Sequence, residues 1–453
     1  MARPATQAGL IFVGSHLGYP MDRTPLGGGA MVGLHLARAW AADASLRLAV
    51  LGSGSRPPFK DSSCASYVQL GRAEGELSGL SEWAYARFCR NFERETTDWI
   101  LSRAAEWEPG RTAVVLNDLS EAPDIPSLKR AGYRVTTIWH VDVVDYFSKL
   151  YLRGCLDAAG SAGLYEALRR ARLSGLLPDV LKLVFEKQRR AVELSDLMVL
   201  PSRAMAQTLG RCYGGTFRQS RPVEGRCLVQ PWGALGAWRA AEPSRLKRLR
   251  DHYGIGPRAR VLLTLSRISP EKGIDILLEA LLKLERSGRL YEDVVVLVCG
   301  EAAFMRGRSY LARVRQAASA LKRARVFFPG YLSDEEKPEF FALAQLFVSP
   351  SLHESYGLTI VEALRSGLPV LASDHYGVRD ILKPAYGVAV AYPDRRRAPQ
   401  ALSAPLEALL GDPGKLAAMG RAAAAAGGAM TFEAAASALT GAVLGLSPRP
   451  ALA

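Results

Sequence analysis

The second half of the chain alternates between two hydrophobic patterns. Short continuous apolar runs are followed by longer stretches in which apolar residues recur three or four positions apart. The first pattern is typical of buried strands and the second of amphipathic helices. Their alternation predicts a parallel sheet wound with helices on both faces. The predicted strands lie near residues 260–265, 294–299, 326–329, 346–349, 370–373 and 387–391.

The first half shows the same two patterns less regularly. A large helical insert is predicted at residues 148–193, and alanine-rich helices are predicted for the tail at 398–446. With 453 residues and 49% hydrophobic content, the chain has enough apolar material for two or three domains. The other elements predicted in this half are strands at 9–14, 113–116, 135–139 and 197–200, and helices at 30–42 and 83–107.

The most informative stretch follows the predicted strand at 346–349. A helix is expected to begin near Tyr356-Gly357 and to end before Gly367, with Pro369 beyond it. The first backbone amides of a helix have no partner inside it, and the helix dipole favours negative charge at that end. The amides of Tyr356 to Leu358 therefore form a predicted anion site.

Two glutamates flank this helix start. Glu354 lies in the loop before the helix, and Glu362 lies in its second turn. A diphosphate on the amides between them would leave one carboxylate on each side, ready to accept hydrogen bonds from hydroxyl groups. The alternative is structural: Glu362 pairs with Arg365 one turn on, and Glu354 only complements the helix dipole.

Two cations follow the first predicted strand of the second half. Arg267 and Lys272 lie on the loop after residues 260–265, at the sheet edge where open α/β sheets bind ligands. A guanidinium fork and an ammonium group there match a diphosphate. In the alternative, Lys272 is a surface lysine and Arg267 pairs with Glu271.

The first half offers a glycine loop and polar residues at strand ends. Three glycines at 27–29 precede a helix, a layout that presents backbone amides to phosphate, although a flexible turn explains them equally well. Asn117 and Asp118 end one predicted strand, and His140 ends the next. A structural role for His140 stays open at this point.

The net charge of +14 allows nucleic acid, an anionic membrane surface or anionic small substrates as partners. The arginines are spread along the chain without basic blocks or interleaved aromatic residues, so we expect no nucleic acid partner. The insert at 148–193 combines arginines with leucines. This indicates possible peripheral membrane contact or, alternatively, a solvated basic face on core-packed helices.

Other classes of site find little support. No apolar run approaches the roughly 18–20 residues that span a bilayer. The apolar run near the first residues is too short for a signal peptide. The six cysteines are scattered and are expected to be reduced, and the six histidines are equally dispersed. The sequence predicts a cytoplasmic protein with no metal site, and it leaves open a peripheral contact at the inner face of the membrane.

The stretch from Glu354 to Val370 resembles the signature of glycosyltransferase family 4, whose members have the GT-B fold. The family pattern is a glutamate, an aromatic-Gly-Leu step, a second glutamate followed by alanine, and Gly-Leu-Pro-Val; all parts occur here in order. Residues 266–273 resemble the family's Gly-Arg-Leu-x-x-x-Lys-Gly diphosphate motif, with Ser266 replacing its glycine. In one departure, His375-Tyr376-Gly377 stands where the family has two glycines near the donor sugar, which leaves the sugar open.

The resemblance implies an α/β chain of the GT-B fold, with two facing Rossmann-like, doubly wound domains and a cleft between them. An acceptor-side domain is expected at residues 1–231 and a nucleotide-sugar-binding domain at 232–425. A terminal helix within 426–453 is expected to cross back to the first domain.

The resemblance also implies residue roles. Arg267 and Lys272 would neutralise the diphosphate leaving group, Glu354 would orient the donor sugar, and His140 would face that sugar, which makes these four the catalytic set. Tyr331 and Leu332 would border the nucleotide base, and Glu362 would hold the ribose hydroxyls. The implied donor-binding and substrate-binding set is Gly27, Gly28, Gly29, Tyr331, Leu332, Ser355, Tyr356, Gly357, Leu358 and Glu362.

The implied reaction is transfer of a sugar from a nucleotide-diphosphate sugar to an acceptor hydroxyl, with retained anomeric configuration and no metal. The departing phosphate would take the acceptor's proton. No further cofactor is implied, and a UDP-sugar is favoured over a GDP- or ADP-sugar. The acceptor is a glycan, a lipid or a small molecule. The alternatives are another GT-B enzyme, either a nucleotide-sugar epimerase or a phosphorylase, and a non-catalytic nucleotide-sugar sensor.

Overall fold

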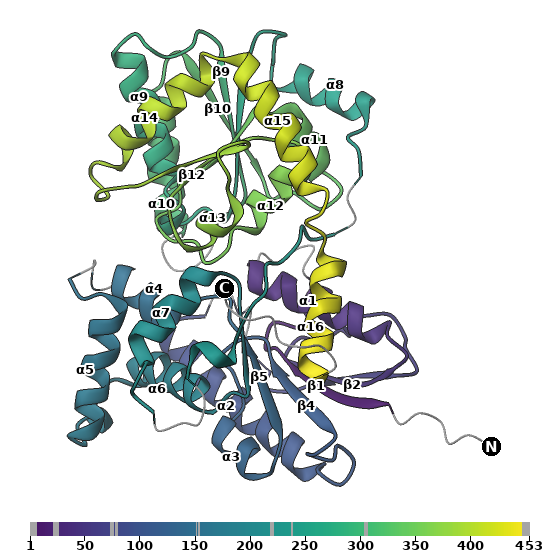
Figure 1. Cartoon of the computed structure of the whole chain (residues 1–453). Helices are drawn as coiled ribbons and strands as arrows, with labels where there is room; N and C mark the ends of the chain where they lie inside the picture. Colours follow the sequence, from purple (N-terminus) through teal and green to yellow (C-terminus); the bar gives the residue numbers. More distant parts are fainter. Residues whose placement is uncertain are drawn as a thin grey trace. The chain divides into compact units, whose positions relative to one another are not determined.

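A computed structural model shows two α/β units within the chain (Figure 1). The residues described are 7–20, 27–72, 77, 80–150, 152, 155–217, 222–236, 239–302 and 307–445. Unit 1 comprises residues 1–231 and 433–453, and unit 2 comprises residues 232–432. Each unit is built on its own sheet.

Unit 1 contains a seven-stranded sheet in the order β3-β2-β1-β4-β5-β6-β7, with every strand pair parallel. The continuous apolar sequence of its central strands fits a sheet that is covered on both faces. Within β1, Leu10 to Val13 are at most 2% exposed. The strands are β1 (Ala8–Val13), β2 (Leu46–Gly52), β3 (Ala65–Gln69), β4 (Thr112–Leu116), β5 (Arg134–Ile138), β6 (Leu197–Leu200) and β7 (Cys227–Val229).

The helices of unit 1 cover this sheet and build the insert before β6. They are α1 (Gly28–Ala41), α2 (Glu82–Ser102), α3 (Ile125–Arg130), α4 (Val143–Leu150), α5 (Ala158–Arg170), η2 (Ser174–Leu176), α6 (Asp179–Leu194), α7 (Arg203–Tyr213) and η3 (Glu224–Arg226). The helix predicted at 83–107 ends at Ser102, and turns follow it to residue 106.

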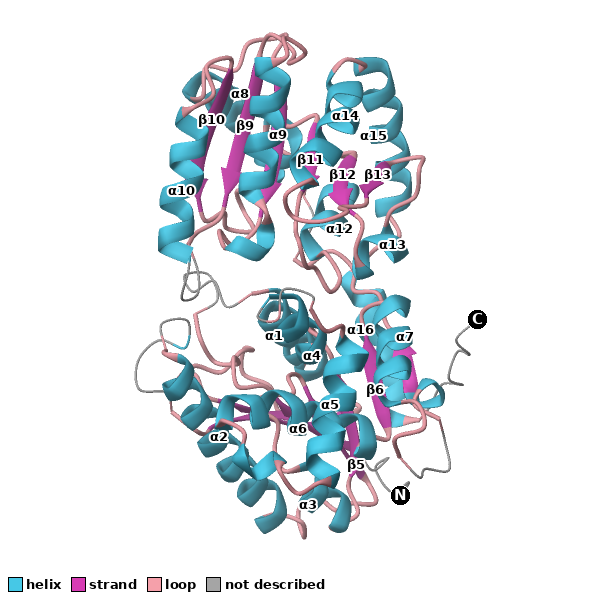
Figure 2. Cartoon of the chain, turned by 90° about the vertical axis from the view of Figure 1, so that its left-hand side faces the viewer, coloured by secondary structure: helices cyan, strands magenta, loops and turns pink. Residues whose placement is uncertain are grey.

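Unit 2 contains a six-stranded parallel sheet in the order β10-β9-β8-β11-β12-β13, with helices on both sides (Figure 2). All six predicted strands are confirmed within two residues at each end. They are β8 (Arg260–Leu265), β9 (Val294–Cys299), β10 (Ala324–Gly330), β11 (Leu346–Ser349), β12 (Val370–Ser373) and β13 (Gly387–Val390).

The helices of unit 2 alternate with these strands, as the sequence pattern predicted. They are α8 (Pro243–His252), η4 (Pro270–Lys272), α9 (Ile274–Arg286), α10 (Gly307–Ser319), α11 (Lys337–Leu343), α12 (Leu358–Arg365), α13 (Tyr376–Ile381), α14 (Ala398–Leu410) and α15 (Pro413–Gly427). The helix expected near Tyr356-Gly357 begins at Leu358, with Gly357 as its N-cap.

In each sheet, the order in which the chain adds strands reverses direction at one place. In unit 1 the chain runs outward from β1 through β2 and β3, and then returns to place β4 on the other side of β1. In unit 2 the same reversal separates β8 from β11. Loops diverge at such a switch point, and the crevice at the carboxyl ends of its strands is the usual ligand site in open α/β sheets. We call these the β1/β4 and β8/β11 switch points.

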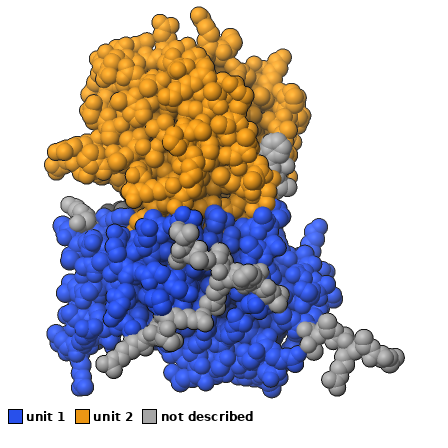
Figure 3. Space-filling view, in the orientation of Figure 1, with its two compact units in different colours: residues 1–231, 433–453 blue, residues 232–432 orange. Residues whose placement is uncertain are grey.

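The last helix, α16 (Phe432–Leu444), belongs almost entirely to unit 1, although unit 2 precedes it in sequence. Figure 3 shows the two units in different colours. Trp40 of α1 is 1% exposed, and its indole Nε1–H donates to Oγ1 of Thr440 at 2.8 Å. A residue near the end of the chain therefore completes the surroundings of the first helix.

Candidate active site

The β8/β11 switch point brings the loop after β8 against the loop after β11. Gly273 has a φ of 63°, in the left-handed region, and a Cβ at this position would lie 2.2 Å from the carbonyl oxygen of Pro350. Only glycine fits such a close approach in this conformation. The backbone of Gly273 thus fixes where Lys272, the residue before it, lies relative to the β11 loop.

Lys272 and Glu354 meet at this place. The Nζ of Lys272 lies 2.6 Å from Oε2 of Glu354, and the two side chains are 12% and 23% exposed. Burial alone would raise the pKa of Glu354, but Lys272, His375 and His353 outweigh burial and hold the pKa below its usual value. Glu354 is therefore ionised at neutral pH, and the alternative of Lys272 as a surface lysine is wrong.

Arg267 lies on the same loop. Its guanidinium Nη2 is 3.9 Å from Oε1 of Glu271, beyond hydrogen-bonding distance, and its side chain is 28% exposed. Oε1 of Glu271 accepts a hydrogen bond from the Ser269 hydroxyl at 2.5 Å. The pairing of Arg267 with Glu271 that the sequence left open is thus a loose ion pair. The role of Arg267 toward a diphosphate stays a prediction.

The anion site predicted at Tyr356 to Leu358 lies at the start of α12, and its binding of an anion stays a prediction. Gly357 has a φ of 104°, and its carbonyl oxygen accepts the first bonds of the helix, from the amides of Ile360 and Val361. The Tyr356 hydroxyl donates to the carbonyl oxygen of Trp232, and its ring is buried. The Tyr356 side chain thus anchors the loop, and Ser355 beside it is also buried.

The departure from the family pattern at residues 375–377 has a packing role. A Cβ on Gly377 would lie 2.0 Å from the carbonyl oxygen of Tyr356. The start of α13 therefore lies against the backbone that leads into α12. One of the glycines expected from the resemblance is present for this contact, and His375 stands near Glu354 as a charge that lowers its pKa.

Glu362 has one oxygen engaged and one without a partner. Its Oε1 lies 3.3 Å from Nζ of Lys337, which also contacts Asp334 at 2.9 Å. Its Oε2 is buried and accepts no hydrogen bond within the described part of the chain. Burial raises the pKa of Glu362 despite the neighbouring Lys337. The alternative pairing with Arg365 is wrong.

The loop after β10 joins this end of the site. Tyr331 is 36% exposed, while Leu332 is 3% exposed and faces the interior. Asp334 and Lys337 connect the loop to Glu362. The loop that contains Tyr331 and Leu332, predicted to border the nucleotide base, is thus connected to Glu362, predicted to hold the ribose. Leu332 has little exposed surface for contact with a ligand.

In unit 1, the glycine loop and the predicted histidine lie together. Gly27 has a φ of 96° and is the N-cap of α1. A Cβ on Gly29 would lie 2.7 Å from Cγ of His140, so the imidazole packs directly on the helix backbone. Asn117 connects the two, because its amide donates to the Gly29 carbonyl oxygen at 3.2 Å and its Oδ1 lies 3.1 Å from Nε2 of His140.

His140 is set up as a neutral imidazole. Burial is the largest influence and lowers its pKa, and the charge on His16 acts in the same direction against Asp118. A neutral imidazole can donate a single hydrogen bond without a net charge. The roles assigned to His140 and to Gly27, Gly28 and Gly29 stay predictions.

Two residues beside His140 were not selected from the sequence as site residues. His16 follows β1, and Asp118, noted only as a polar residue at a strand end, follows β4. Nδ1 of His16 lies 3.4 Å from Oδ2 of Asp118. The available signal was their place after the two strands of the β1/β4 switch point, which required the strand order of the sheet.

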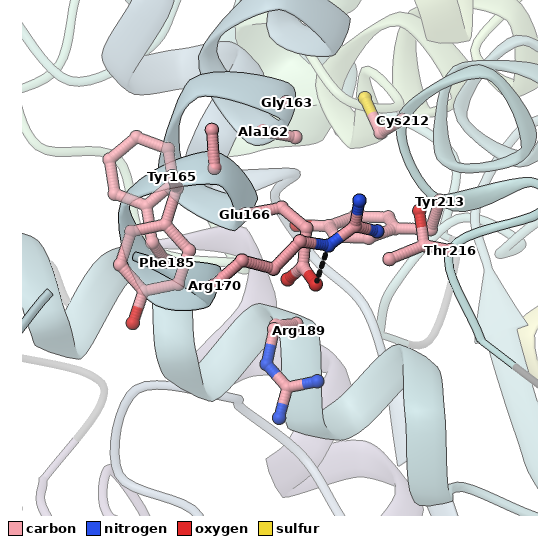
Figure 4. Close-up of a pocket in the computed structure, with 11 residues that line it drawn as sticks. Ala162, Gly163, Tyr165, Glu166, Arg170, Phe185, Arg189, Cys212, Tyr213 and Thr216 are labelled. Carbon is pink, nitrogen blue, oxygen red and sulfur yellow. Dashed lines mark hydrogen bonds and ion pairs between the residues drawn. The ribbon is translucent and has the colours of Figure 1, made fainter. Parts of the chain in front are cut away.

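A separate pocket lies among α5, α6 and α7 of unit 1 (Figure 4). Its volume of about 210 Å³ is below the roughly 300–1,000 Å³ of typical ligand pockets. Nε of Arg170 lies 3.3 Å from Oε1 of Glu166 in its wall. None of the predicted site residues lines this pocket, so we do not assign it to the candidate active site.

No group of three or more His, Cys, Asp or Glu side chains arranged to hold a metal ion is found among the described residues. Metal independence stays a prediction. Likewise, no helix within the described ranges is long and apolar enough to cross a membrane.

The second unit matches a known family. Residues 247–426 match the family described as Glycosyl transferases group 1. The α-D-kanosaminyltransferase of Streptomyces kanamyceticus is 32% identical over 170 residues, which are 38% of this chain and 41% of that protein. The chain spans about half or less of the length of the curated relatives it matches.

Solved structures match nearly the whole chain. The sucrose-phosphate synthase of Thermosynechococcus elongatus superposes with a TM-score of 0.68 at 16% identity, over 97% of this chain and 99% of that one. HepE of Anabaena, in complex with UDP and glucose, gives 0.62 at 17% identity, over 97% and 100%. Together with the two parallel sheets, this confirms the predicted GT-B fold. The cleft predicted between the domains stays a prediction.

Proposed function

We propose that this protein is a retaining, metal-independent glycosyltransferase that moves a sugar from a nucleotide-diphosphate sugar to an acceptor hydroxyl. Unit 2 would hold the donor. The observation that carries the proposal is the buried Oε2 of Glu362, which lacks a hydrogen-bond donor within the described residues. An unpaired buried carboxylate oxygen is costly, and ribose hydroxyls would satisfy it. The family match of residues 247–426 supports the same conclusion.

The cations of the β8/β11 switch point give the proposal its chemistry. As the bond from the sugar to the diphosphate breaks, negative charge grows on the departing phosphate. Arg267 and Lys272 would neutralise that charge, and preorganised electrostatic stabilisation of this kind is often the largest contribution to catalysis. Lys272 now contacts Glu354 at 2.6 Å, so donor binding would divide its interactions between the carboxylate and the phosphate.

We favour a UDP-sugar as the donor. The solved relative HepE is described with UDP and glucose bound, and its likeness to this chain supports the choice by analogy. Tyr331, which is 36% exposed at the end of β10, would stack on the base. Neutral His140 would face the transferred sugar from unit 1.

The proposal is tested by nucleotide binding. Calorimetry with UDP, GDP and ADP in metal-free buffer should show micromolar binding of one of them. Glu362→Gln should weaken that binding about 10- to 100-fold, because a charged hydrogen bond contributes roughly 1.5–3 kcal/mol. Glu279→Gln, on an exposed position of α9, is the matched control and should leave binding unchanged. Absence of binding by all three nucleotides would overturn the proposal.

Glu362→Gln should increase the stability of the protein, although it weakens nucleotide binding. Because the pKa of Glu362 is raised in the folded protein, ionisation opposes folding as pH rises above the unfolded value. Glu362→Gln removes this cost, so its free energy of unfolding relative to wild type should increase from pH 4 to pH 7. Weaker binding together with higher stability is the signature of a carboxylate kept for a ligand.

We further propose a cytoplasmic location with contact to an anionic membrane surface through α5 and η2. Leu164, Leu173 and Leu176 are 53%, 47% and 82% exposed there, close to Arg170 and Arg172. Exposed leucines beside arginines suit an interface with anionic lipid. Leu173→Ser with Leu176→Ser should reduce cosedimentation with phosphatidylglycerol vesicles, whereas Trp83→Ser, an exposed aromatic of α2, should not. Equal sedimentation of all three proteins would refute this contact.

A further inference from the structure

The small pocket of unit 1 is lined by none of the residues predicted to bind the donor. Residues of α5, α6, α7 and the turn after α7 form its walls, and its volume is about 210 Å³ (Figure 4). An apolar cavity of about 150 Å³ holds one benzene molecule. The pocket therefore has room for a single ring with a small substituent.

Aromatic rings form one wall of this pocket. Tyr165 of α5 and Phe185 of α6 stack with their ring centroids 5.2 Å apart, and each residue is 6% exposed. The Tyr165 hydroxyl donates to Oε2 of Glu186 at 2.9 Å, which holds the ring in place. Tyr213 adds a third ring, and burial raises the pKa of the Cys212 thiol, which is therefore neutral. These walls fit the faces of a flat apolar molecule.

Arg170 is the cation that a ligand in this pocket can reach. Glu166 is held by Arg169, whose Nε and Nη2 donate to its two oxygens at 2.9 and 2.7 Å. Arg170 contacts the same carboxylate more loosely, through Nε at 3.3 Å, and its side chain is 68% exposed. The Arg189 guanidinium contacts two carboxylates of its own helix and points away from the other labelled side chains (Figure 4). Two arginines thus share Glu166, and an anion at Arg170 would complete the charge balance.

Small residues of α5 keep the pocket open. Gly163 and Ala167 lie four positions apart on one face of the helix, and both are exposed. A Cβ on Gly163 would meet no heavy atom within 4 Å, and its φ is not left-handed. Glycine inside a helix lowers its stability, so this position needs another reason. At Gly160 packing is the reason, because a Cβ there would lie 2.9 Å from the Leu156 side chain. At Gly163 the reason is the open pocket.

We propose that this pocket binds a small aromatic carboxylate. The ring would lie against Tyr165 and Phe185, and the carboxylate would accept hydrogen bonds from Arg170. A neutral ring would leave Arg170 unused, and an anion without a ring would leave the aromatic wall in contact with water. The pocket lies within unit 1 alone, so the proposal does not rest on the transferase function.

Three probes test the class of ligand, each added to the full chain in calorimetry. Benzoate should bind with a Kd on the order of 0.1–1 mM, as expected for a ligand of about nine non-hydrogen atoms. Benzylamine has the same ring with the opposite charge, and acetate has the charge without the ring. Each should bind at least about tenfold more weakly. Benzylamine binding as tightly as benzoate, or no benzoate binding at about 10 mM, would overturn the proposal.

Two variants test where benzoate binds. Gly163→Leu adds a side chain at the opening of the pocket, and Arg170→Gln removes the charge. Each should weaken benzoate binding about tenfold or more. The matched controls are Gly110→Leu, at an exposed glycine with open space, and Arg172→Gln, at an exposed arginine outside the pocket, and both should bind as wild type does. Unchanged affinity in either test variant would overturn the proposal.

The melting temperature of Gly163→Leu separates a blocked pocket from a damaged fold. Leucine is a better helix former than glycine, and the new Cβ meets open space, so the melting temperature should stay equal or rise. Weaker benzoate binding at an unchanged or higher melting temperature supports the proposal. A lower melting temperature would contradict the open space at Gly163 on which it depends.

Competition with nucleotide distinguishes this pocket from the donor site. Saturating benzoate should leave the Kd for UDP within about twofold of its value without benzoate, because the two sites share no residue. Mutual exclusion of benzoate and UDP would place benzoate in the donor site and overturn the proposal. Benzoate binding in a protein that binds none of UDP, GDP and ADP would contradict the transferase function and support the pocket.

Discussion

The side chains that follow the strands at the two switch points differ in chemical character. In unit 2 the residues after β8 and β11 supply a cationic pair, Arg267 and Lys272, with Lys272 bound to ionised Glu354. In unit 1 the residues after β1 and β4 supply His16 and Asp118, with Glu121 nearby. The first set joins two cationic side chains to a carboxylate, while the second pairs a histidine with a carboxylate.

Under our proposed function, stabilising a departing diphosphate requires positive charge, which unit 2 supplies at its switch point. The same sheet topology thus presents different side chains at its two switch points, and the residues after two strands decide which ones. Three variants test this division, from the largest expected effect to the smallest.

Lys272→Met should cause the largest loss. The change keeps the length of the side chain but removes its charge, and it leaves the half-buried carboxylate of Glu354 without its 2.6 Å partner. We expect kcat to fall about 10²–10³-fold, as for loss of one preorganised transition-state contact. Steady-state kinetics at about pH 7 should show this loss in kcat.

Lys383→Met provides the control for this variant, since Lys383 is an exposed lysine of the same unit. It should retain wild-type turnover. Wild-type turnover in Lys272→Met as well would break the comparison, because unit 2 would then not depend on this charge.

Gly300→Ala tests how rigidly unit 2 holds its cations. Gly300 follows β9 and has a φ of 127°, and a Cβ there would lie 1.8 Å from the carbonyl oxygen of Ser266, the residue before Arg267. The backbone conformation alone should cost roughly 1–3 kcal/mol, so urea unfolding should show a clear loss of stability. Gly288→Ala, at a φ of 70° with open space around it, should cost less.

The counterpart in unit 1 is Gly14, the residue after β1. A Cβ there would lie 3.1 Å from the Leu17 side chain, which can move, rather than against backbone. Gly14→Ala should therefore be milder than Gly300→Ala. Equal losses at the two glycines would show that both switch points are framed with the same rigidity.

Tyr85→Phe should give the smallest effect and sharpens the description of unit 1. The variant removes the hydrogen bond that lowers the pKa of Glu121, so Glu121 is neutral over a wider pH range. His16 then loses part of the charge that raises its pKa, and its titration should move to lower pH. Histidine resonances should show a shift smaller than that of Asp118→Asn. An equal or larger shift would show that Glu121, and not Asp118, is the carboxylate with the larger effect on the pKa of His16.

Much of unit 2 was predictable because its strands are continuous apolar runs with buried faces on both sides. In unit 1, the strands β2, β3 and β7 were not predicted. β3 (Ala65–Gln69) is a half-exposed edge strand whose polar residues lack that pattern, and β7 (Cys227–Val229) has only three residues. The loop positions of Arg267 and Glu354 followed from the strand ends. Their backbone setting did not, because close approaches such as that of Gly273 to Pro350 depend on the packed structure.

Contacts between distant segments were the part that sequence could not supply. Lys337 belongs to no motif, yet it is the residue that engages Glu362. The motif assigned Lys272 and Glu354 to different parts of the donor, and the structure joins them directly. His16 gained significance only when the strand order placed β1 beside β4.

The contribution of α16 to unit 1 has a consequence for biosynthesis. Trp40 and Thr440 are 400 residues apart and share a hydrogen bond. At the roughly 5–20 residues per second of translation, the first helix of unit 1 emerges about 20–80 s before its partner. Unit 2, residues 232–432, is synthesised during that interval as one continuous segment, and it can fold before α16 is complete. Until α16 emerges, nascent unit 1 exposes the apolar surface that α16 covers in the folded protein. A chaperone that binds this surface would protect the nascent chain.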